Sequence, residues 1–174
     1  NTGTIAPDQH GTHVGGTIAA TTNNGVGVAG IAGGSGTGDG ARLMSCAAFG
    51  ANNSGGFAET YAYGADNGAV ISQNSWGYTS PGVFEQAVLD GIDYFIAEAG
   101  KDNNGNQIGP MKGGIVIFAA GNDNNNSQHY PGFYAPTLSV SGTNHMDKKA
   151  WYSNFGDWVD IAAPGGETNT VSQQ

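Results

Sequence analysis

The chain has 174 residues, which is enough for one domain with a hydrophobic core and too few to suggest two. Fourteen acidic residues against five basic ones give a formal net charge of −9, and the few cations form no patch that could follow a nucleic-acid backbone. A single cysteine excludes an internal disulfide framework, and no apolar run approaches the ~20 residues of a membrane-spanning helix.

Short apolar runs bounded by glycine predict strands, and stretches of helical periodicity between them predict helices. In chain order, we predict a helix over 11–20, a strand over 43–49, a helix over 57–67, a strand over 69–73, a helix over 83–99, and strands over 114–120, 138–142 and 158–162. The run Ile115–Ala119 is continuously apolar, which is typical of a strand buried on both faces of a parallel sheet. Because strands and helices alternate, we expect an α/β fold with three layers and a mostly parallel sheet.

The strongest chemical signal is the glycine-rich segment 10–20, which begins with His10. The positive end of a helix dipole opposes protonation of a histidine at the helix start, which keeps the imidazole available as a base. A capping histidine beside a packed one is the simpler interpretation. His10 and His13 could also form an i, i+3 metal pair, but zinc needs three or four ligands. The other two histidines, His129 and His145, lie in unrelated loops without ligand spacing.

The second signal is Asn122, which follows Ala119, Ala120 and Gly121 just beyond the predicted strand over 114–120. An amide at this position can point into the cleft at the carboxyl edge of a parallel sheet, where such sheets bind ligands. A carboxamide is a neutral hydrogen-bond donor that does not compete for protons, so it suits an oxyanion hole. An ordinary turn asparagine is the alternative.

These two segments, in this order, resemble the histidine and asparagine motifs of the subtilase family of serine proteases. The resemblance implies a subtilisin-type fold, with His10 as the catalytic base, His13 as a structural residue and Asn122 as the oxyanion donor. It also implies that Ala119, Ala120 and Gly121 line the primary specificity pocket. Segments 130–136, 153–156 and 160–165 follow the family's downstream order. In that family the bond between Tyr130 and Pro131 is a cis peptide.

Two further segments resemble the family's substrate-binding edges, which pair with an extended polypeptide as an added strand. They are Ser75-Trp76-Gly77 and Asn53-Ser54-Gly55. The family commonly has leucine where this chain has Trp76. With Phe57 nearby, Trp76 implies an aromatic wall for a distal specificity pocket, and a core tryptophan is the alternative.

Residues 23–30 resemble the family's calcium-binding loop. Calcium takes oxygen ligands, and a loop punctuated by glycine can turn an amide and several carbonyls inward. The resemblance implies that Asn24 contributes its side chain and that Val26 and Val28 contribute their carbonyls. Ca²⁺ would then be structural, with no catalytic cofactor, and an ordinary glycine/asparagine connection is the alternative. Segment 102–106 has a similar composition but is too short for an EF-hand and lacks the closing glutamate.

Two parts of the family pattern do not occur in these 174 residues. No strand ending in Asp-Ser-Gly or Asp-Thr-Gly precedes His10, and Asp8 is too near to orient the far ring nitrogen. No Gly-Thr-Ser-Met-Ala segment follows residues 160–165, and Ser172 has no such context. We therefore expect residues 1–174 to be one partial catalytic domain, an internal fragment incomplete at both ends. Without the serine no acyl-enzyme forms, so the fragment should be inactive alone.

The resemblance also implies partners and a location. The expected partners are an extended polypeptide substrate and the missing triad segments of the parent chain, with no nucleic acid and no membrane. The parent protein is expected to be secreted or located in the cell envelope. The alternative function is a non-catalytic peptide-binding module, or a pseudoenzyme, that retains the substrate groove.

Overall fold

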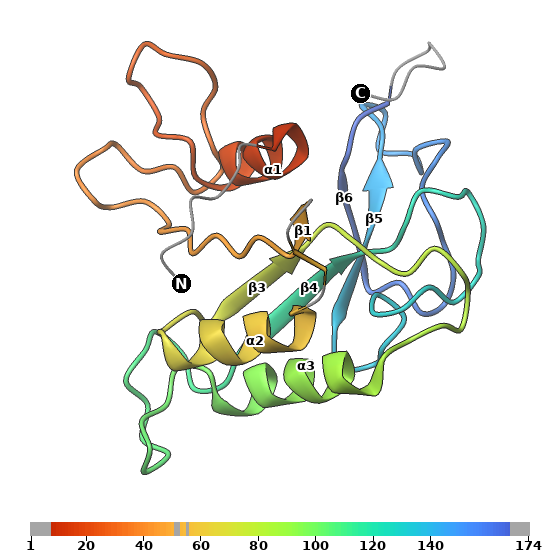
Figure 1. Ribbon diagram of the computed structural model, residues 1–174. Helices are drawn as coiled ribbons and strands as arrows, with labels where there is room; N and C mark the ends of the chain where they lie inside the picture. Colours follow the sequence, from red (N-terminus) through yellow and green to blue (C-terminus); the bar gives the residue numbers. More distant parts are fainter. Residues whose placement is uncertain (1–7, 51–52, 55, 168–174) are drawn as a thin grey trace. The chain divides into compact units, whose positions relative to one another are not determined.

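The computed structural model describes residues 8–50, 53–54 and 56–167. The chain divides after Gly56 into two compact units (Figure 1). None of the helices in these described ranges is long and apolar enough to cross a membrane. The elements of the first unit are α1 (Gln9–Ala19), β1 (Phe49–Gly50) and β2 (Asn53–Ser54). Those of the second unit are α2 (Phe57–Asp66), β3 (Ile71–Asn74), α3 (Gln86–Glu98), β4 (Ile115–Ala119), β5 (Leu138–Thr143) and β6 (Ile161–Pro164).

Helix α1 begins at Gln9, two residues before the predicted start, because Asp8 caps it. Asp8 has extended backbone angles, and its Oδ2 accepts a hydrogen bond of 2.7 Å from the N–H group of Gly11. This bond satisfies one of the four N–H groups that a helix start leaves unpaired. After the helix the chain folds back on it, and Ile31 donates its N–H group to the carbonyl of Thr17.

The strand predicted over 43–49 is wrong except at its last residue. Residues 41–48 have no helix or strand, and β1 contains only Phe49 and Gly50, which pair with β2 in an antiparallel hairpin. Leu43 is 55% exposed and Met44 is 38% exposed. Strand formation depends on packing against neighbouring strands and on burial, so apolar composition alone did not impose it here.

The second unit is built on a four-stranded sheet with the order β3-β4-β5-β6, in which every pair is parallel. Helix α3 connects β3 to β4. The parallel sheet confirms the predicted α/β class. Strand β6 begins at Ile161, three residues later than predicted, because residues 156–159 form a turn in which Val159 donates to the carbonyl of Gly156.

Helices α2 and α3 lie side by side along one face of this sheet (Figure 1). Their apolar residues meet the buried side chains of β4 and form the core. Its members are Tyr61, Ala65, Val88, Leu89, Ile92, Phe95, Ala99, Val116 and Phe118. The hydroxyl of Tyr61 donates a 3.2 Å hydrogen bond to Oδ1 of the buried Asn74, which ties α2 to the end of β3. Burial raises the pKa of the Tyr61 hydroxyl above its ordinary value, so this donor stays protonated.

The opposite face of the sheet is open. Ile71 of β3, Ile115 of β4 and Ile161 of β6 are 58%, 40% and 53% exposed. Within β4, exposed or half-buried residues alternate with Val116 and Phe118, which are buried. The expectation that β4 is buried on both faces is therefore not met, because α2 and α3 cover only one of them.

Substitution of Ile92 by alanine should destabilise the second unit by about 2–5 kcal/mol, because it leaves a cavity at a fully buried site. Ile108→Ala is the matched control, since the same atoms are removed from a side chain that is 70% exposed and lies outside the sheet. Urea denaturation of the full-length protein, followed by circular dichroism, measures both. A loss for Ile108→Ala as large as that for Ile92→Ala would contradict this account of the core.

Candidate active site

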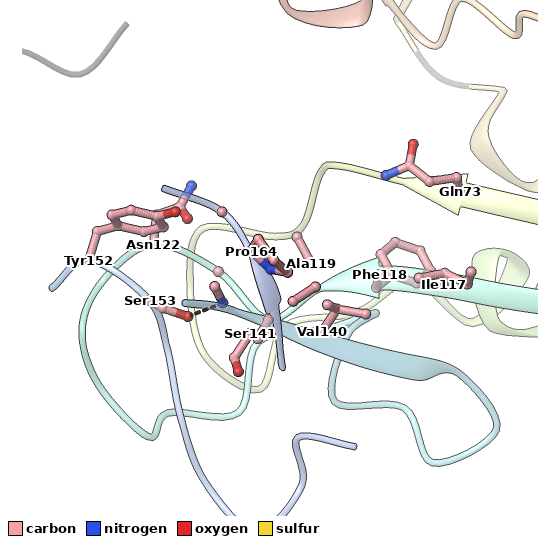
Figure 2. Close-up of a pocket in the computed structure, with 15 residues that line it drawn as sticks. Gln73, Ile117, Phe118, Ala119, Asn122, Val140, Ser141, Tyr152, Ser153 and Pro164 are labelled. Atoms are coloured by element: carbon pink, nitrogen blue, oxygen red, sulfur yellow. Dashed lines mark hydrogen bonds between the residues drawn. The ribbon is translucent and has the colours of Figure 1, made fainter. Parts of the chain in front are cut away.

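A pocket of about 270 Å³ opens at the carboxyl ends of the strands in the second unit (Figure 2). It brings together four residues that the sequence singled out, namely Ala119, Ala120, Gly121 and Asn122. Several lining residues come from the open face of the sheet and from the segments after β5 and β6. Among them are Gln73, Val140, Gly142, Tyr152 and Gly165. The pocket therefore lies at the sheet edge where parallel sheets bind ligands.

Strand β4 delivers Asn122 to this edge. The ladder continues one residue past β4, since Ala120 donates its N–H group to the carbonyl of Val140 over 2.9 Å. Gly121 then takes a φ of 108°, a left-handed conformation that side chains other than glycine's rarely adopt. The chain turns there, and the side chain of Asn122 is left exposed at the pocket (Figure 2).

The loop around Asn122 is held by a residue that no sequence pattern had assigned to the site. Asn154 is fully buried, and its amide bonds to the backbone at Ala120 and Asp123, on either side of Asn122. The only signal in the sequence was the landmark segment 153–156, which carried no role. A buried asparagine must find hydrogen-bond partners, but its sequence context does not reveal which ones.

The segment just before Asn154 forms another part of the pocket that the sequence did not indicate. The hydroxyl of Ser153 accepts a 2.8 Å hydrogen bond from the N–H group of Gly142, drawn as a dashed line in Figure 2. Tyr152 lines the pocket and donates its hydroxyl to the carbonyl of Gly166. Burial raises the pKa of the Tyr152 hydroxyl, so the pocket presents a neutral aromatic wall there.

Ser75, Trp76 and Gly77 are not among the residues that line this pocket. Trp76 is half-buried and packs against the core, with ring centroids 4.5 Å from Phe57 and 5.4 Å from Phe118. Its indole N–H group donates to Oδ1 of Asn74 over 3.3 Å. Phe57 is thus the neighbour that we expected, and the packing favours the core interpretation of Trp76.

His129 connects two loops near Asn122. His129 is largely buried, and its Nδ1 lies 3.1 Å from the carbonyl of Tyr78. Because a carbonyl can only accept, Nδ1 carries the proton in this contact. The Nε2 atom lies 3.7 Å from Oδ2 of Asp123. The bond between Tyr130 and Pro131, which follows directly, is cis as the resemblance implied.

In the first unit, His10 lies in the first turn of α1, at the predicted helix start, and it is exposed. The carboxylate of Asp8 caps the helix and is occupied by that bond. His13 is exposed as well, and no residue of α1 is buried. Asn53 and Ser54 form β2, whereas Gly55 lies outside the described residues. Within the described ranges, no three His, Cys, Asp or Glu side chains are grouped so as to hold a metal ion.

The loop that resembles a calcium site forms a tight Asx turn. Oδ1 of Asn24 accepts a 3.0 Å hydrogen bond from the N–H group of Val26, and Gly25 and Gly27 both have positive φ. Val26 and Val28 are 75% and 70% exposed. One amide oxygen and two carbonyls fit a hard cation in donor type, and six-fold coordination needs further oxygens.

Segment 102–106 closes on itself instead. The carboxylate of Asp102 accepts hydrogen bonds from the N–H groups of Asn104 and Asn106 and from the amide of Asn106. The bond from the Asn106 side chain, followed by that from its backbone, lowers the pKa of Asp102. The carboxylate is thus used within its own turn.

Comparison with known proteins identifies relatives of this chain. The sequence model of a protein family, described as the subtilase family, matches residues 5–174. The chain is 33% identical over 159 residues to thermitase from Thermoactinomyces vulgaris, covering 90% of the chain and 49% of thermitase. It is 31% identical over 161 residues to a thermophilic serine proteinase from Bacillus sp. (strain AK1), covering 91% of the chain and 34% of that protein. The chain therefore spans about a third to a half of these relatives.

Solved structures agree with this match. A protease from Pseudoalteromonas arctica has a TM-score of 0.64 at 28% identity, covering 90% of this chain and 44% of the other. A mutant of the protease domain of PatA has a TM-score of 0.62, covering 90% of this chain and 52% of the other. At 19% identity, the second likeness concerns the fold alone.

Substitution of Gly121 by alanine should destabilise the second unit more than the positive φ alone explains. That conformation costs about 1–3 kcal/mol for a residue with a Cβ atom, and here the Cβ would also overlap the amide nitrogen of Asn154. Gly82→Ala is the matched control, since Gly82 has a φ of 74° and no atom within 4 Å of an added Cβ. Urea denaturation of the full-length protein compares the two variants, and equal losses would contradict the tight contact at Gly121.

Proposed function

Because the chain belongs to the subtilase family, we propose that it is the part of a serine endopeptidase that supplies the general base and the oxyanion-hole amide. His10 accepts the proton of the nucleophilic serine and later returns it to the leaving amine. Asn122 donates its amide to the oxygen that becomes negatively charged when the peptide carbonyl is attacked. The observation that carries this proposal is the exposed amide of Asn122 beside a pocket at the carboxyl edge of the parallel sheet.

The chemistry of an amide supports this role for Asn122. An oxyanion donor must be aimed before the reaction, stay uncharged and release no proton to the intermediate. A carboxamide meets these conditions at any pH at which the imidazole of His10 can act as a base. The pocket next to it is lined by small residues at Ala119 and Gly121, which leaves room for a large apolar side chain of the substrate.

The serine and the aspartate of the triad are proposed to come from other parts of the parent protein. This chain spans only about a third to a half of its curated relatives. The open face of the sheet supports the proposal, since further segments packed there would cover Ile71, Ile115 and Ile161. Burying several hundred Å² of apolar surface stabilises a fold by roughly 10 kcal/mol, which is comparable to the stability of a whole domain. Alone, the chain should therefore be unstable and inactive.

The substrate is proposed to be an extended polypeptide that pairs with Ser75–Gly77 on one side and with Asn53–Gly55 on the other. Backbone hydrogen bonds would satisfy the amides of the peptide, as in strand addition to a sheet edge. The names of the relatives, which are proteinases, support a peptide substrate. A protein of this kind would act outside the cytoplasm, and Asn24 with the carbonyls of Val26 and Val28 would contribute to a structural calcium site.

Substitution of Asn122 by alanine in the full-length parent protein should lower kcat by about 10²–10³, a magnitude that comes from a member of this same family. His10→Ala should lower it by about 10⁴–10⁶, a range also taken from this class of enzyme. The measurement is hydrolysis of an apolar peptide substrate. Asn126→Ala is the control, because Asn126 is another exposed asparagine of the same loop, and it should leave kcat unchanged.

Two outcomes would contradict the proposed function. Asn122→Ala with full kcat would remove the oxyanion role. Stoichiometric labelling of the purified 174-residue chain by a fluorophosphonate would show that a serine within it is already activated. Peptide binding by the full-length protein without any turnover would instead favour a non-catalytic peptide-binding module.

Addition of Ca²⁺ should raise the Tm of the full-length protein, because a ligand present at 100 times its Kd stabilises the folded state by about 2.7 kcal/mol. Asn24→Ala should reduce this shift, since it removes the one side-chain oxygen proposed as a ligand in the loop. Asn103→Ala tests the turn at Asp102 as a control and should leave the shift intact. A Tm that does not respond to Ca²⁺ would refute the calcium site.

A further inference from the structure

Asn154 is a fully buried polar side chain on a segment far from Asn122 in the sequence. Asn154 lies outside the strands of the sheet. Leaving a buried amide without partners costs about 1–3 kcal/mol, so its hydrogen bonds are expected to be well defined. Every hydrogen bond of the Asn154 amide goes to the loop that carries Asn122.

The contacts lie on both sides of Asn122. Oδ1 of Asn154 accepts from the N–H group of Asp123 over 2.8 Å and from that of Asn125 over 3.3 Å. Nδ2 donates to the carbonyl of Ala120 over 3.0 Å. The backbone N–H group of Asn154 donates to the carbonyl of Gly121, also over 3.0 Å. Asn154 is thus bonded on both sides of Asn122, through its side chain to Ala120 and Asp123 and through its backbone N–H group to Gly121.

We propose that Asn154 is a positioning residue that sets the direction in which Asn122 presents its amide to the substrate. This inference rests on the proposed function, because a direction matters only if Asn122 stabilises an oxyanion. A preorganised donor must be held within about 0.5 Å of its productive position. The turn at Gly121, with its φ of 108°, lacks a side chain that could hold it, and the buried amide of Asn154 supplies the missing restraint.

The chemistry of the contacts selects asparagine at this position. One end of the side chain must accept from two N–H groups while the other end donates to a carbonyl, and only a carboxamide does both at neutral pH. Aspartate would keep the two accepted bonds but would place a carboxylate against the carbonyl of Ala120. Alanine or serine would leave groups of the loop without their partner. The amide nitrogen lies so close to Gly121 that a Cβ atom added there would overlap it.

Neighbouring bonds hold Asn154 itself in place. The hydroxyl of Ser153 accepts from Gly142 at the end of the sheet and donates to the carbonyl of Asn154. Two backbone bonds run beside the clamp, from Asn124 to the carbonyl of Tyr152 and from Phe155 to that of Asn125. The segment 152–155 is therefore bonded to the loop 121–125 along its length and is anchored to β5.

A second buried asparagine in the same unit provides a matched control. Asn144 is 7% exposed, and its Oδ1 accepts from the N–H groups of Met146 and Lys148, over 2.9 and 3.2 Å. Its Nδ2 donates to Glu167 over 2.6 Å. This is the same kind of clamp on a loop that carries none of the proposed catalytic residues. Its removal should affect stability without affecting the oxyanion donor.

The test is a double-mutant cycle in the full-length protein. Both kcat and KM are measured, and kcat is calculated from the concentration of active sites found by titration. A displacement of about 1 Å can lower a rate by about 10²-fold, so Asn154→Ala should lower kcat by roughly tenfold to a hundredfold with little change in KM. Asn144→Ala should lower Tm by a similar amount and leave kcat unchanged. In the Asn122→Ala background, Asn154→Ala should lower kcat by less than about twofold, because a missing donor cannot be misdirected.

The failures of the two proposals are distinguishable. If Asn122→Ala leaves kcat intact, the oxyanion role itself falls, and the inference falls with it. If Asn122→Ala lowers kcat but Asn154→Ala does not, or if the two losses multiply, the proposed function stands and the positioning role is refuted. A loss of Tm alone, as for Asn144→Ala, also refutes it.

Asn154→Asp serves as a second variant, since it keeps both bonds accepted by Oδ1 and removes only the donor to Ala120. It should lower kcat in the same direction as Asn154→Ala, and full activity would overturn the inference. Hydrogen exchange of the unsubstituted protein covers the case in which neither variant folds. The N–H groups of Asp123 and Asn125 should then be strongly protected, and exchange as fast as that of a free amide would overturn the clamp.

Discussion

Parallel pairing of β4 with both β3 and β5 is the constraint on which the second unit depends. The register of Ile71 with Ile115 and of Ile117 with Leu138 places the carboxyl ends of the three strands at one edge. The chain leaves β4 at this edge, so Ala119, Ala120, Gly121 and Asn122 enter the pocket together. The same pairing turns Val116 and Phe118 toward α3 and leaves Ile115 and Ala119 on the open face. Core, pocket and open face thus follow from one strand.

Two buried asparagine side chains hold segments at the ends of the strands that the strand pairing itself does not fix. Asn74, at the end of β3, receives bonds from Tyr61 and Trp76 and donates to the carbonyl of Ile117, so it joins α2, β3 and β4. Asn154 does the same for the loop after β4. A carboxamide suits both places because it donates and accepts at once without a charge to desolvate. The edge of the sheet is shaped as much by these two side chains as by the strands themselves.

Much of the fold followed from local patterns, and the errors have a common cause. The helices, the strands of the sheet and the position of Asn122 were predicted to within a few residues. The strand over 43–49 was wrong because Leu43 and Met44 are exposed and the run is not part of a core. Ile115 and Ala119 are exposed, although the apolar run suggested burial on both faces. An apolar run indicates that its residues prefer to be buried, but burial also requires another part of the chain to cover them.

The sequence by itself determined the α/β class, the family and the residue types of the proposed site, because periodicity, helix caps and short motifs are local properties of the chain. His10 at the start of α1 and Asn122 just beyond β4 are of this kind. Only the tertiary structure decided that Tyr152, Ser153 and Gly165 complete the pocket, that Trp76 packs against the core, and that Asn154 bonds to the loop of Asn122. The physical reason is that these contacts join segments dozens of residues apart. The partner of a buried amide is chosen by the packing that brings such segments together.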